Sequence, residues 1–444
     1  MTLAEHHAGL GSVRKIARVP ARKKMLRHLP LMLCALTAAL GPAYVVRWHI
    51  GFYPTTLLET AILVTLAVFA LAGIVAGQAL EWRSVLTLPT ALFIMAGCLS
   101  VLDAPSRTAA LGIFRAYLVE PVAFALVLIT LLKTPRKAHM IAAGFWAGGI
   151  VLAVANLATV LHAIKAHEFS VSGAPPVAIY TAANAVALYL VPLIAIAGSF
   201  LLYESERWLR GASAVFLAIT VPTVILTFSR GGWAALVAVS AGLALTHRRR
   251  LWLVGGLVAA GGALVSIPAI RDRLALDLRY DSGETFSGRL GIWSDSISML
   301  RHRPIFGAGL SGFAQRMGPA WATKHQVVAI YPHNIVLNFW SETGLLGLIA
   351  FGAIVGATGV TAWRGWRSGA SGWKPIHFGV LLALLAVLVH GLVDVPYFKN
   401  DLSLEFWGLT AMTWAGWRWE LRQSDGPSGH LASPRSRGST TSGL

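Results

Sequence analysis

Two stretches in the second half of the sequence carry residues that could do chemistry. The first, 287–313, reads SGRLGIWSDSISMLRHRPIFGAGLSGF and lies within Arg271–Tyr331, the only long polar interval between apolar segments. The second, 331–348, reads YPHNIVLNFWSETGLLGL and opens with His333 and Asn334. A histidine can accept a proton near neutral pH, and an arginine can bind a phosphate through two N–H groups. The two stretches therefore combine a candidate base with candidate anion ligands.

Arg289 is the candidate phosphate ligand of the first stretch. Apolar residues recur at i, i+3, i+7 and i+10 from Leu290 through Trp293 to Leu300, which predicts one apolar face of a short helix ended by Pro304. Arg289 would stand in the first turn of this helix, where backbone N–H groups are free. A phosphate is favoured at such a helix N-terminus.

His333 directly precedes an apolar helix for which Asn334 is a natural N-cap. Asn334, Asn338, Ser341 and Glu342 then follow at i, i+4, i+7 and i+8. A polar stripe on an apolar helix must face protein or water rather than lipid. We therefore expect His333 at the mouth of a polar cavity, where it could act as a base.

Further polar residues lie inside apolar segments or at their ends, where ionisable groups are costly and usually face a bundle interior. They are Arg115, Glu120, Asn184, Arg230, His390 and Asp394. In the orientation derived below, all but Glu120 lie in the outer half of the membrane or at its outer surface. This co-location predicts one outward-facing cavity. Two glycines after Arg230 predict a tight chain reversal there.

Each of these residues also has a structural explanation. Arg230 could be an arginine at the membrane interface, and Asn184 could make a hydrogen bond between helices. Arg115 is too deep for the first explanation, which leaves function or a buried ion pair, and Glu120 is better explained as a structural partner. A scaffold role is favoured for His390 and Asp394, and a solvated charge for Arg301 and Arg303.

The composition defines the protein class. Hydrophobic residues make up 56% of the 444 residues and charged residues only 13%, and the mean hydropathy is +0.64. Apolar runs of about 17–25 residues, each long enough to cross a bilayer, recur through the chain. We predict an all-α polytopic membrane protein with about twelve spans: 29–46, 55–77, 86–102, 109–132, 139–161, 179–202, 211–228, 233–246, 250–268, 334–359, 376–393 and 402–417.

The distribution of Lys and Arg orients these spans. Cytoplasmic loops are enriched in both residues, and a cytoplasmic N-terminus places most of the basic residues of the short connections inside. Long loops translocate regardless of charge, so the arginine-rich loop is assigned to the periplasm. The predicted organisation is a basic cytoplasmic segment 1–28, spans one to nine over 29–268, a large periplasmic loop with short helices over 269–333, spans ten to twelve over 334–417, and a disordered cytoplasmic tail 418–444.

Net charge and cysteines exclude other classes. The formal net charge is +18, but the positive-inside rule and anionic lipid substrates account for it without nucleic acid as a partner. Cys34 and Cys98 both lie in apolar runs and indicate no disulfide framework. The sequence has no HExxH motif and no His/Cys cluster, so we expect no metal and no cofactor.

Four segments together resemble the O-antigen ligase and polymerase superfamily of bacterial membrane glycosyltransferases. They are TFSRGGW (227–233), the stretch 287–313, HNIVLNFWSETGLLGL (333–348) and HGLVDVP (390–396). FRAYLVEP (114–121) and the segment around Asn184 fit more weakly. The resemblance covers about the last 230 residues well, and it implies an α-helical membrane bundle with one large periplasmic loop.

The resemblance also implies an activity at the periplasmic face of the bacterial inner membrane. A glycan would move from undecaprenyl pyrophosphate to an acceptor hydroxyl, by a metal-independent and inverting transfer. Arg230 and Arg289 would bind the pyrophosphate, and His333 would act on the acceptor hydroxyl. We expect further substrate contacts from Arg115, Asn184, Asn334, Asn338, Glu342 and Asp394.

Three functions remain open at this point. A ligase would use lipid A–core as acceptor, and we favour it on the overall resemblance. A polymerase would use another lipid-linked repeat unit as acceptor. A transporter or flippase of an anionic lipid-linked glycan would also need arginines around an outer cavity, but it would form no glycosidic bond.

The predicted orientation can be tested with topology reporters. Fusions at Lys137, Arg249 and Ser371 should report cytoplasmic, because these positions lie in the basic connections. Fusions at Asp281 and Ala320 should report periplasmic. A cytoplasmic signal at Asp281 would contradict the periplasmic loop and with it the outward-facing cavity.

Overall fold

The computed structural model describes residues 21–51, 53–77, 79–81, 84, 86–169, 175–268, 270–272, 275, 286–317, 330–368 and 372–424. Most of this part is helical, as predicted. The longest stretches outside the described residues are 1–20 of the N-terminal segment, 276–285 and 318–329 of the long loop, and 425–444 of the tail.

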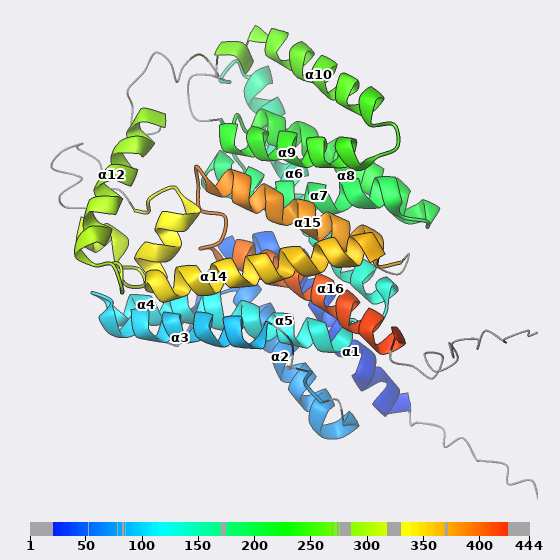
Figure 1. Cartoon of the computed structure of the whole chain (residues 1–444), viewed down its shortest axis with the longest axis vertical. Helices are drawn as coiled ribbons and strands as arrows, with labels where there is room; N and C mark the ends of the chain where they lie inside the picture. The colour runs from blue at the N-terminus through cyan, green and yellow to red at the C-terminus, as the bar shows by residue number, and fades with distance from the viewer. Residues whose placement is uncertain are drawn as a thin grey trace, which may run out of the picture.

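The helices follow one another along the chain as a bundle (Figure 1). Their bounds are α1 Ala21–Ala39, α2 Leu57–Ala76, α3 Thr87–Asp103, α4 Arg107–Ile113, α5 Glu120–Leu131, α6 Pro135–Lys165, α7 Ala183–Tyr203, α8 Arg207–Leu226, α9 Arg230–Thr246, α10 Arg250–Ser266, α12 Phe286–His302, α14 Ile335–Ser368, α15 Lys374–Gly391 and α16 Asn400–Ser424. The π-helix η2 (Phe114–Val119) joins α4 to α5, and the 3₁₀ helix η1 (Gly41–Val45) follows α1. A short antiparallel hairpin of β1 (Arg47–Ile50) and β2 (Tyr53–Thr56) precedes α2, with Arg47 opposite Thr56.

Seven helices of the described part are long and apolar enough to cross a membrane: α2, the continuous α4–η2–α5 unit, α6, α7, α8, α14 and α15. Four shorter apolar helices are His28–Ala39 within α1, α3, α9 and α10. Each of the twelve predicted spans overlaps one helix, with α16 as the last. The structure therefore confirms a multi-helix membrane protein, whereas the count of twelve spans stays a prediction.

The core of the bundle is formed around α7. Of its span, 89% is buried, because α15, α8 and α9 pack around it. At the other extreme, α10 packs on α9 and has no buried residue. A helix that is apolar all round and buried by its neighbours is typical of the centre of a membrane bundle.

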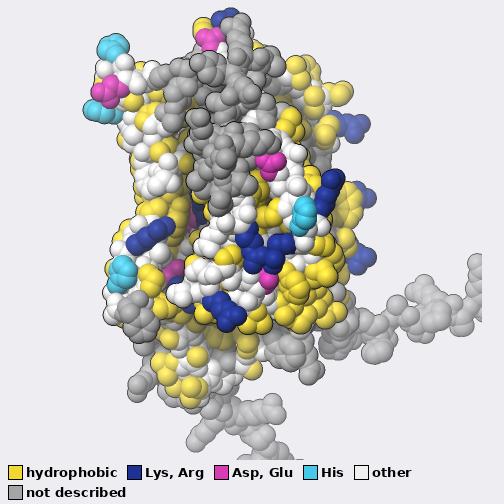
Figure 2. Space-filling model, turned by 90° about the vertical axis from the view of Figure 1, so that its left-hand side faces the viewer, with side chains coloured by type: hydrophobic (Ala, Val, Ile, Leu, Met, Phe, Trp, Pro, Cys, Tyr) yellow, Lys and Arg dark blue, Asp and Glu magenta, His cyan; other side chains and the backbone are white. Residues whose placement is uncertain are grey.

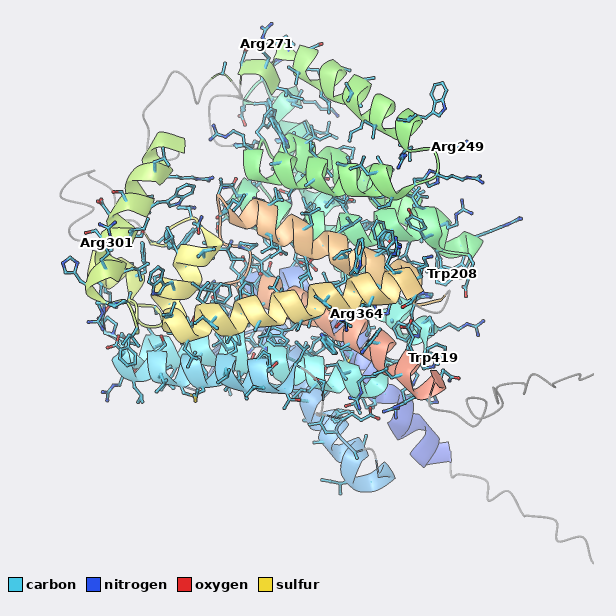
Figure 3. All side chains as sticks on the ribbon, viewed as in Figure 1. Trp208, Arg249, Arg271, Arg301, Arg364 and Trp419 are labelled. Atoms are coloured by element: carbon cyan, nitrogen blue, oxygen red, sulfur yellow. The ribbon has the colours of Figure 1, made fainter. Side chains whose placement is uncertain are left out.

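The two ends of the bundle differ. Arg249, Arg364 and Trp419 lie at one end, and Arg301 on α12 lies at the other (Figure 3). Lys and Arg side chains also gather on the face at the α12 end (Figure 2). Arg249 and Arg364 belong to predicted cytoplasmic connections and Arg301 to the predicted periplasmic loop, so the arrangement is consistent with the predicted orientation.

The segment that follows α12 docks on a break in α14. Gly344 lies inside α14 with φ +69° and ψ −179°, a conformation open essentially to glycine alone. On either side of the break, Leu345 N donates to Ile305 O at 2.9 Å and Ala308 N donates to Ser341 O at 2.7 Å. Backbone groups next to the break in α14 therefore form hydrogen bonds with the segment that follows α12. These bonds fix the position of α12 relative to α14.

A carboxylate at the end of α3 holds the same segment. Arg303 donates to both carboxylate oxygens of Asp103 at 2.7 and 2.6 Å, and to Gly307 O at 2.7 Å. Arg316 donates to Asp103 O at 2.5 Å. The interpretation of Arg303 as a solvated charge is therefore wrong, because a residue 200 positions earlier in the chain pairs with it.

The apolar face predicted for α12 is only partly correct. Leu300 is buried, but Leu290 and Ile297 are exposed, at 48% and 40%. The buried stripe instead contains Ile292 and Ser296, which continue to Leu300 at intervals of four. The periodicity identified the helix correctly but not its buried side, since apolar residues occur on both faces.

The break in α14 can be tested with a matched pair of substitutions. A Cβ on Gly344 would lie 2.4 Å from Ile305 O, and the left-handed backbone itself costs about 1–3 kcal/mol for other residues. Gly344→Ala should therefore lower the melting temperature of the purified protein clearly. Gly352→Ala, in the same helix with open space at its Cβ, should leave it unchanged or slightly raised. Equal melting temperatures for both variants would contradict the role of the break.

Candidate functional site

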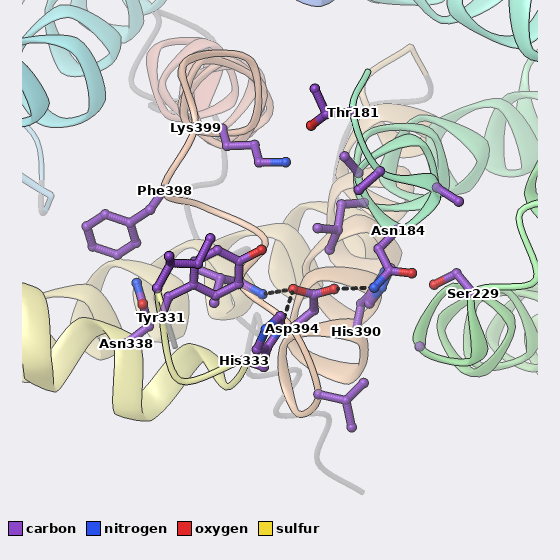
Figure 4. A pocket seen from close by; sticks show the side chains of 18 of the residues that line it. Thr181, Asn184, Ser229, Tyr331, His333, Asn338, His390, Asp394, Phe398 and Lys399 are labelled. Atoms are coloured by element: carbon purple, nitrogen blue, oxygen red, sulfur yellow. Dashed lines mark hydrogen bonds and ion pairs between the residues drawn. The ribbon is translucent and has the colours of Figure 1, made fainter. Parts of the chain in front are cut away.

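A cavity of about 690 Å³ opens at the end of the bundle where α7, α9 and α12 begin (Figure 4). Residues of the segments 113–117, 175–182, 227–229, 311–314, 330–342 and 390–399 also line it. Most of the side chains singled out in the sequence meet here. They are Asn184, Arg230, Arg289, His333, Asn338, Glu342, His390 and Asp394.

His333 and Asp394 form a pair inside the cavity. Nδ1 of His333 is buried, makes no hydrogen bond within the described residues, and lies 3.5 Å from Oδ1 of Asp394. The second oxygen of Asp394 accepts from Asn184 Nδ2 at 3.1 Å, and Oδ1 also accepts from Val395 N at 2.9 Å. A carboxylate at Nδ1 orients the imidazole so that Nε2 is available to a reacting group.

The charge state of the pair follows from its surroundings. Burial would raise the pKa of the Asp394 carboxyl, but the adjacent His333 ring and the nearby positive charge of Arg289 outweigh it and hold the pKa below its usual range. The ring of Tyr331 lies 4.4 Å from that of His333. Burial and the charge of Asp394 raise the pKa of Tyr331 to about 12, so its hydroxyl stays protonated beside an ionised carboxylate.

The backbone around the cavity is strained. His333, Phe228 and Ser311 have φ of +49°, +51° and +60°, and all three line the cavity. Non-glycine residues rarely adopt this left-handed conformation, and such strain concentrates at functional sites. Three separate loops around the cavity therefore each contain a residue in an energetically unfavourable backbone conformation.

Arg230 is the first residue of α9. The Ser229 hydroxyl caps this helix by accepting from Gly232 N at 3.2 Å, so the arginine stands beside the free N–H groups of a helix N-terminus. The predicted role of the two glycines in a reversal is wrong, because the left-handed residue there is Phe228. Gly231 is needed for packing instead: a Cβ would lie 2.6 Å from Cδ2 of His390.

Arg289 lies in the first turn of α12, as predicted. Its positive charge favours the ionised form of both Asp394 and Tyr331 and so lowers the pKa of each. Arg289 therefore lies within electrostatic range of the His333–Asp394 pair. Arg230 and Arg289 thus approach one cavity from two helices that are far apart in the sequence.

The polar stripe of α14 faces inward, as expected. Asn338, Ser341 and Glu342 are all buried, with exposures of 2%, 0% and 7%. Ser311 N donates to Glu342 Oε2 at 2.6 Å. Glu342 therefore lines the cavity and also ties the loop after α12 to α14.

Two predicted substrate-binding residues do not line the cavity. Asn334 caps α14, since its Oδ1 accepts from Val336 N and Leu337 N at 3.0 and 3.1 Å while Nδ2 donates to Leu392 O at 3.0 Å. These hydrogen bonds confirm the predicted N-cap. They show that the Asn334 side chain stabilises the start of α14 and links it to the end of α15.

Arg115 is the other residue outside the cavity. It pairs with Glu59 at 2.9 Å and Glu120 at 2.8 Å, and its guanidinium lies 4.5 Å from the ring centre of Tyr53. Asn400 Nδ2 donates to the same Glu59 at 2.6 Å. Of the two explanations left open by the sequence, the buried ion pair is the one that the structure shows.

Sequence reasoning missed three lining residues: Tyr331, Ser311 and Lys399. Tyr331 is two residues before His333, and Lys399 is five residues after Asp394, so proximity to a motif was an available signal for both. Ser311 gives no such signal, because its left-handed backbone is a property of the folded loop.

The helices and this cavity define a multi-pass membrane protein with a polar site at one end of its bundle. Residues 214–352 match the family model described as O-Antigen ligase. This stretch is therefore similar to that family, in agreement with the resemblance of its motifs. The match supports an enzymatic function without separating ligase from polymerase. No curated protein matches the sequence.

The matched stretch holds only part of the cavity. Arg230, Arg289 and His333 lie within it. Asp394 and Asn184, which complete the hydrogen bonds of the pair, lie outside it. The site is therefore assembled from the matched stretch and from helices on either side of it.

The ionised state of Asp394 makes a testable prediction about stability. A carboxyl with a lowered folded pKa stabilises the fold above its unfolded pKa and loses that effect as the pH falls toward the folded pKa. Asp394→Asn should therefore lower the melting temperature at pH 7, by an amount equivalent to about 1–3 kcal/mol. The difference from wild type should shrink below about pH 4.

The exposed Asp272 provides the control for this measurement. Its side chain is 62% exposed and lies 3.5 Å from Arg271, so Asp272→Asn should change little at either pH. A gap between wild type and Asp394→Asn that stays constant from pH 7 to pH 4 would show that the carboxylate is not selectively ionised in the fold.

Proposed function

We propose that the protein transfers a glycan from a lipid-linked pyrophosphate, undecaprenyl pyrophosphate, to an acceptor hydroxyl in this cavity. The observation that carries the proposal is that His333, next to Asp394, lines the same cavity as Arg230 and Arg289. A base and anion ligands are the two components that such a transfer needs. The family match of the surrounding stretch supports the same activity class.

In the proposed step the acceptor oxygen attacks the anomeric carbon of the donor sugar. A new glycosidic C–O bond forms while the bond between the anomeric carbon and the phosphate oxygen breaks. The electron pair of the broken bond stays on the pyrophosphate, and the hydroxyl proton passes to Nε2 of His333. Asp394 keeps the imidazole oriented and stabilises the imidazolium that forms. Attack opposite the leaving group inverts the configuration.

The arginines act on the leaving group. Negative charge grows on the bridging phosphate oxygen as the bond breaks, and cations already positioned in the cavity stabilise it with little reorganisation. Arg230 carries its charge at a helix N-terminus, which favours an anion there. Arginine also matches phosphate oxygens with two parallel N–H groups, so lysine is a poor substitute at either position.

The acceptor side sets the particular activity. We favour a ligase that uses lipid A–core as acceptor, in line with the description of the matching family. The neutral polar side chains of Asn338 and Tyr331 lie beside His333 in the lining and would bind acceptor hydroxyls. Such a ligase would work in the inner membrane of a bacterium, with the cavity facing the periplasm and without a metal ion.

Reconstituted transfer tests the proposal. The full-length protein in nanodiscs should join glycan to acceptor in excess EDTA, with lipid-linked donor and purified lipid A–core. Arg230→Ala, Arg289→Ala and His333→Ala should each lower the rate at least about a hundredfold, because each removes a group that acts in the transition state. Arg301→Ala, on the exposed side of the same α12, is the matched control and should stay near wild type.

The acceptors separate the alternatives in the same assay. Product on lipid A–core identifies a ligase, and product on a second lipid-linked repeat unit identifies a polymerase. Transbilayer movement of labelled donor without any new glycosidic bond would instead identify a transporter. Full activity of both Arg230→Ala and Arg289→Ala would mean that the pyrophosphate binds elsewhere.

A further inference from the structure

Lys399 is a third cation in the lining of the cavity, beside Arg230 and Arg289. It belongs to the connection between α15 and α16, outside the matched stretch. Figure 4 shows its side chain reaching into the pocket from another side than His333 and Asp394. The three cationic side chains therefore extend into the cavity from three different elements of the fold, α9, α12 and the connection between α15 and α16.

The backbone at Lys399 is firmly held. Its N–H donates to Tyr397 O at 2.7 Å, and its carbonyl accepts from Ser403 N at 2.9 Å as the first turn of α16 begins. The preceding Phe398 packs on Phe339, with ring centroids 4.9 Å apart. Tyr397 is fully buried. The direction of the lysine side chain is thus set by a packed turn rather than by a loose loop.

The ammonium group of Lys399 has no acid partner in the described part of the chain, where no carboxylate lies within 4.0 Å of it. The acid closest in sequence, Asp401, is 1% exposed and accepts a hydrogen bond from the hydroxyl of Tyr180 at 2.5 Å. Other half-buried cations, such as Arg115 and Arg303, are paired. Lys399 interacts electrostatically with Asp401 but without a contact ion pair among the described residues. A half-buried charge that lacks a contact ion pair is costly and can be stabilised by an anion that binds there.

The charge of the lining depends on this residue. The lining contains three cations, Arg230, Arg289 and Lys399, and two carboxylates, Glu342 and Asp394. Lys399 therefore supplies one of the three cationic side chains of the lining. A pyrophosphate diester carries two negative charges, so each cation of the lining adds to its attraction.

We propose that Lys399 binds the pyrophosphate of the lipid-linked donor from the side of the cavity away from His333. The proposal rests on the transfer function proposed above and adds a residue to its donor site. A lysine is a compact point charge on a flexible stem, so its ammonium group can follow a phosphate oxygen as charge builds on the leaving group. Lys399 touches the reacting phosphates and contributes to both donor binding and departure of the pyrophosphate.

The test measures pyrophosphate binding apart from transfer. Inorganic pyrophosphate is titrated by calorimetry into the full-length protein in nanodiscs, and the KM for lipid-linked donor is measured in parallel. Lys399→Met should weaken pyrophosphate binding about tenfold or more and raise the donor KM, because a charged hydrogen bond is lost. Lys399→Arg should restore most of both. Lys374→Met is the control, since Lys374 is half-buried at the start of α15 and lies outside the cavity.

The outcomes separate this proposal from the function on which it rests. Wild-type pyrophosphate affinity in a Lys399→Met protein that melts like wild type would overturn the role of Lys399. A raised donor KM with unchanged affinity for inorganic pyrophosphate would also overturn it, and would place the contact on the glycan. Weakened pyrophosphate binding in a protein that forms no glycosidic bond with any acceptor would support the anion site and contradict the transferase.

Discussion

The structure depends on the docking of the segment after α12 onto the break in α14. This contact uses backbone hydrogen bonds between Ala308 and Ser341 and between Leu345 and Ile305, together with the bond from Ser311 N to the Glu342 carboxylate. Backbone groups released by the break would otherwise be unpaired in a protein interior, which is costly. The same contact carries α12, and with it Arg289, to the cavity at the start of α14. One helix interruption thus couples a polar segment to a membrane bundle.

The cationic side chains fall into two groups, those that are paired with a carboxylate and those that line the cavity. Arg115 forms ion pairs with Glu59 and Glu120, and Arg303 and Arg316 form ion pairs with Asp103. These ion pairs join separate elements of the fold. Arg289 and Lys399 enter the cavity without a comparable ion pair among the described residues. A positive charge that is already neutralised by a close carboxylate has little left for a ligand. The high arginine content of the predicted loop is therefore a mixture of scaffold and binding residues, which composition alone does not separate.

The sequence predicted the helices well because hydropathy and length are local properties. It also predicted that Asn184, Arg230, His333 and Asp394 would share one space, because polar groups in membrane spans must face a common interior. It failed where a distant residue decides the outcome. Arg303 looks solvated until Asp103 is placed beside it, and Arg115 looks functional until Glu59 is. Pairing across 56 or 200 residues leaves no periodic trace in the sequence.

The hydrogen bond from Asn334 to Leu392 O joins the first turn of α14 to the last turn of α15. His333 precedes the first of these turns and Asp394 follows the second, so the members of the pair are mounted on two different helix ends. Their separation therefore depends on the offset between α14 and α15, which this hydrogen bond helps to fix. Changes in bilayer thickness or lateral pressure act on the tilt and offset of membrane helices at small energetic cost. A change that moved α14 along α15 would therefore also alter the 3.5 Å distance between Nδ1 of His333 and Oδ1 of Asp394.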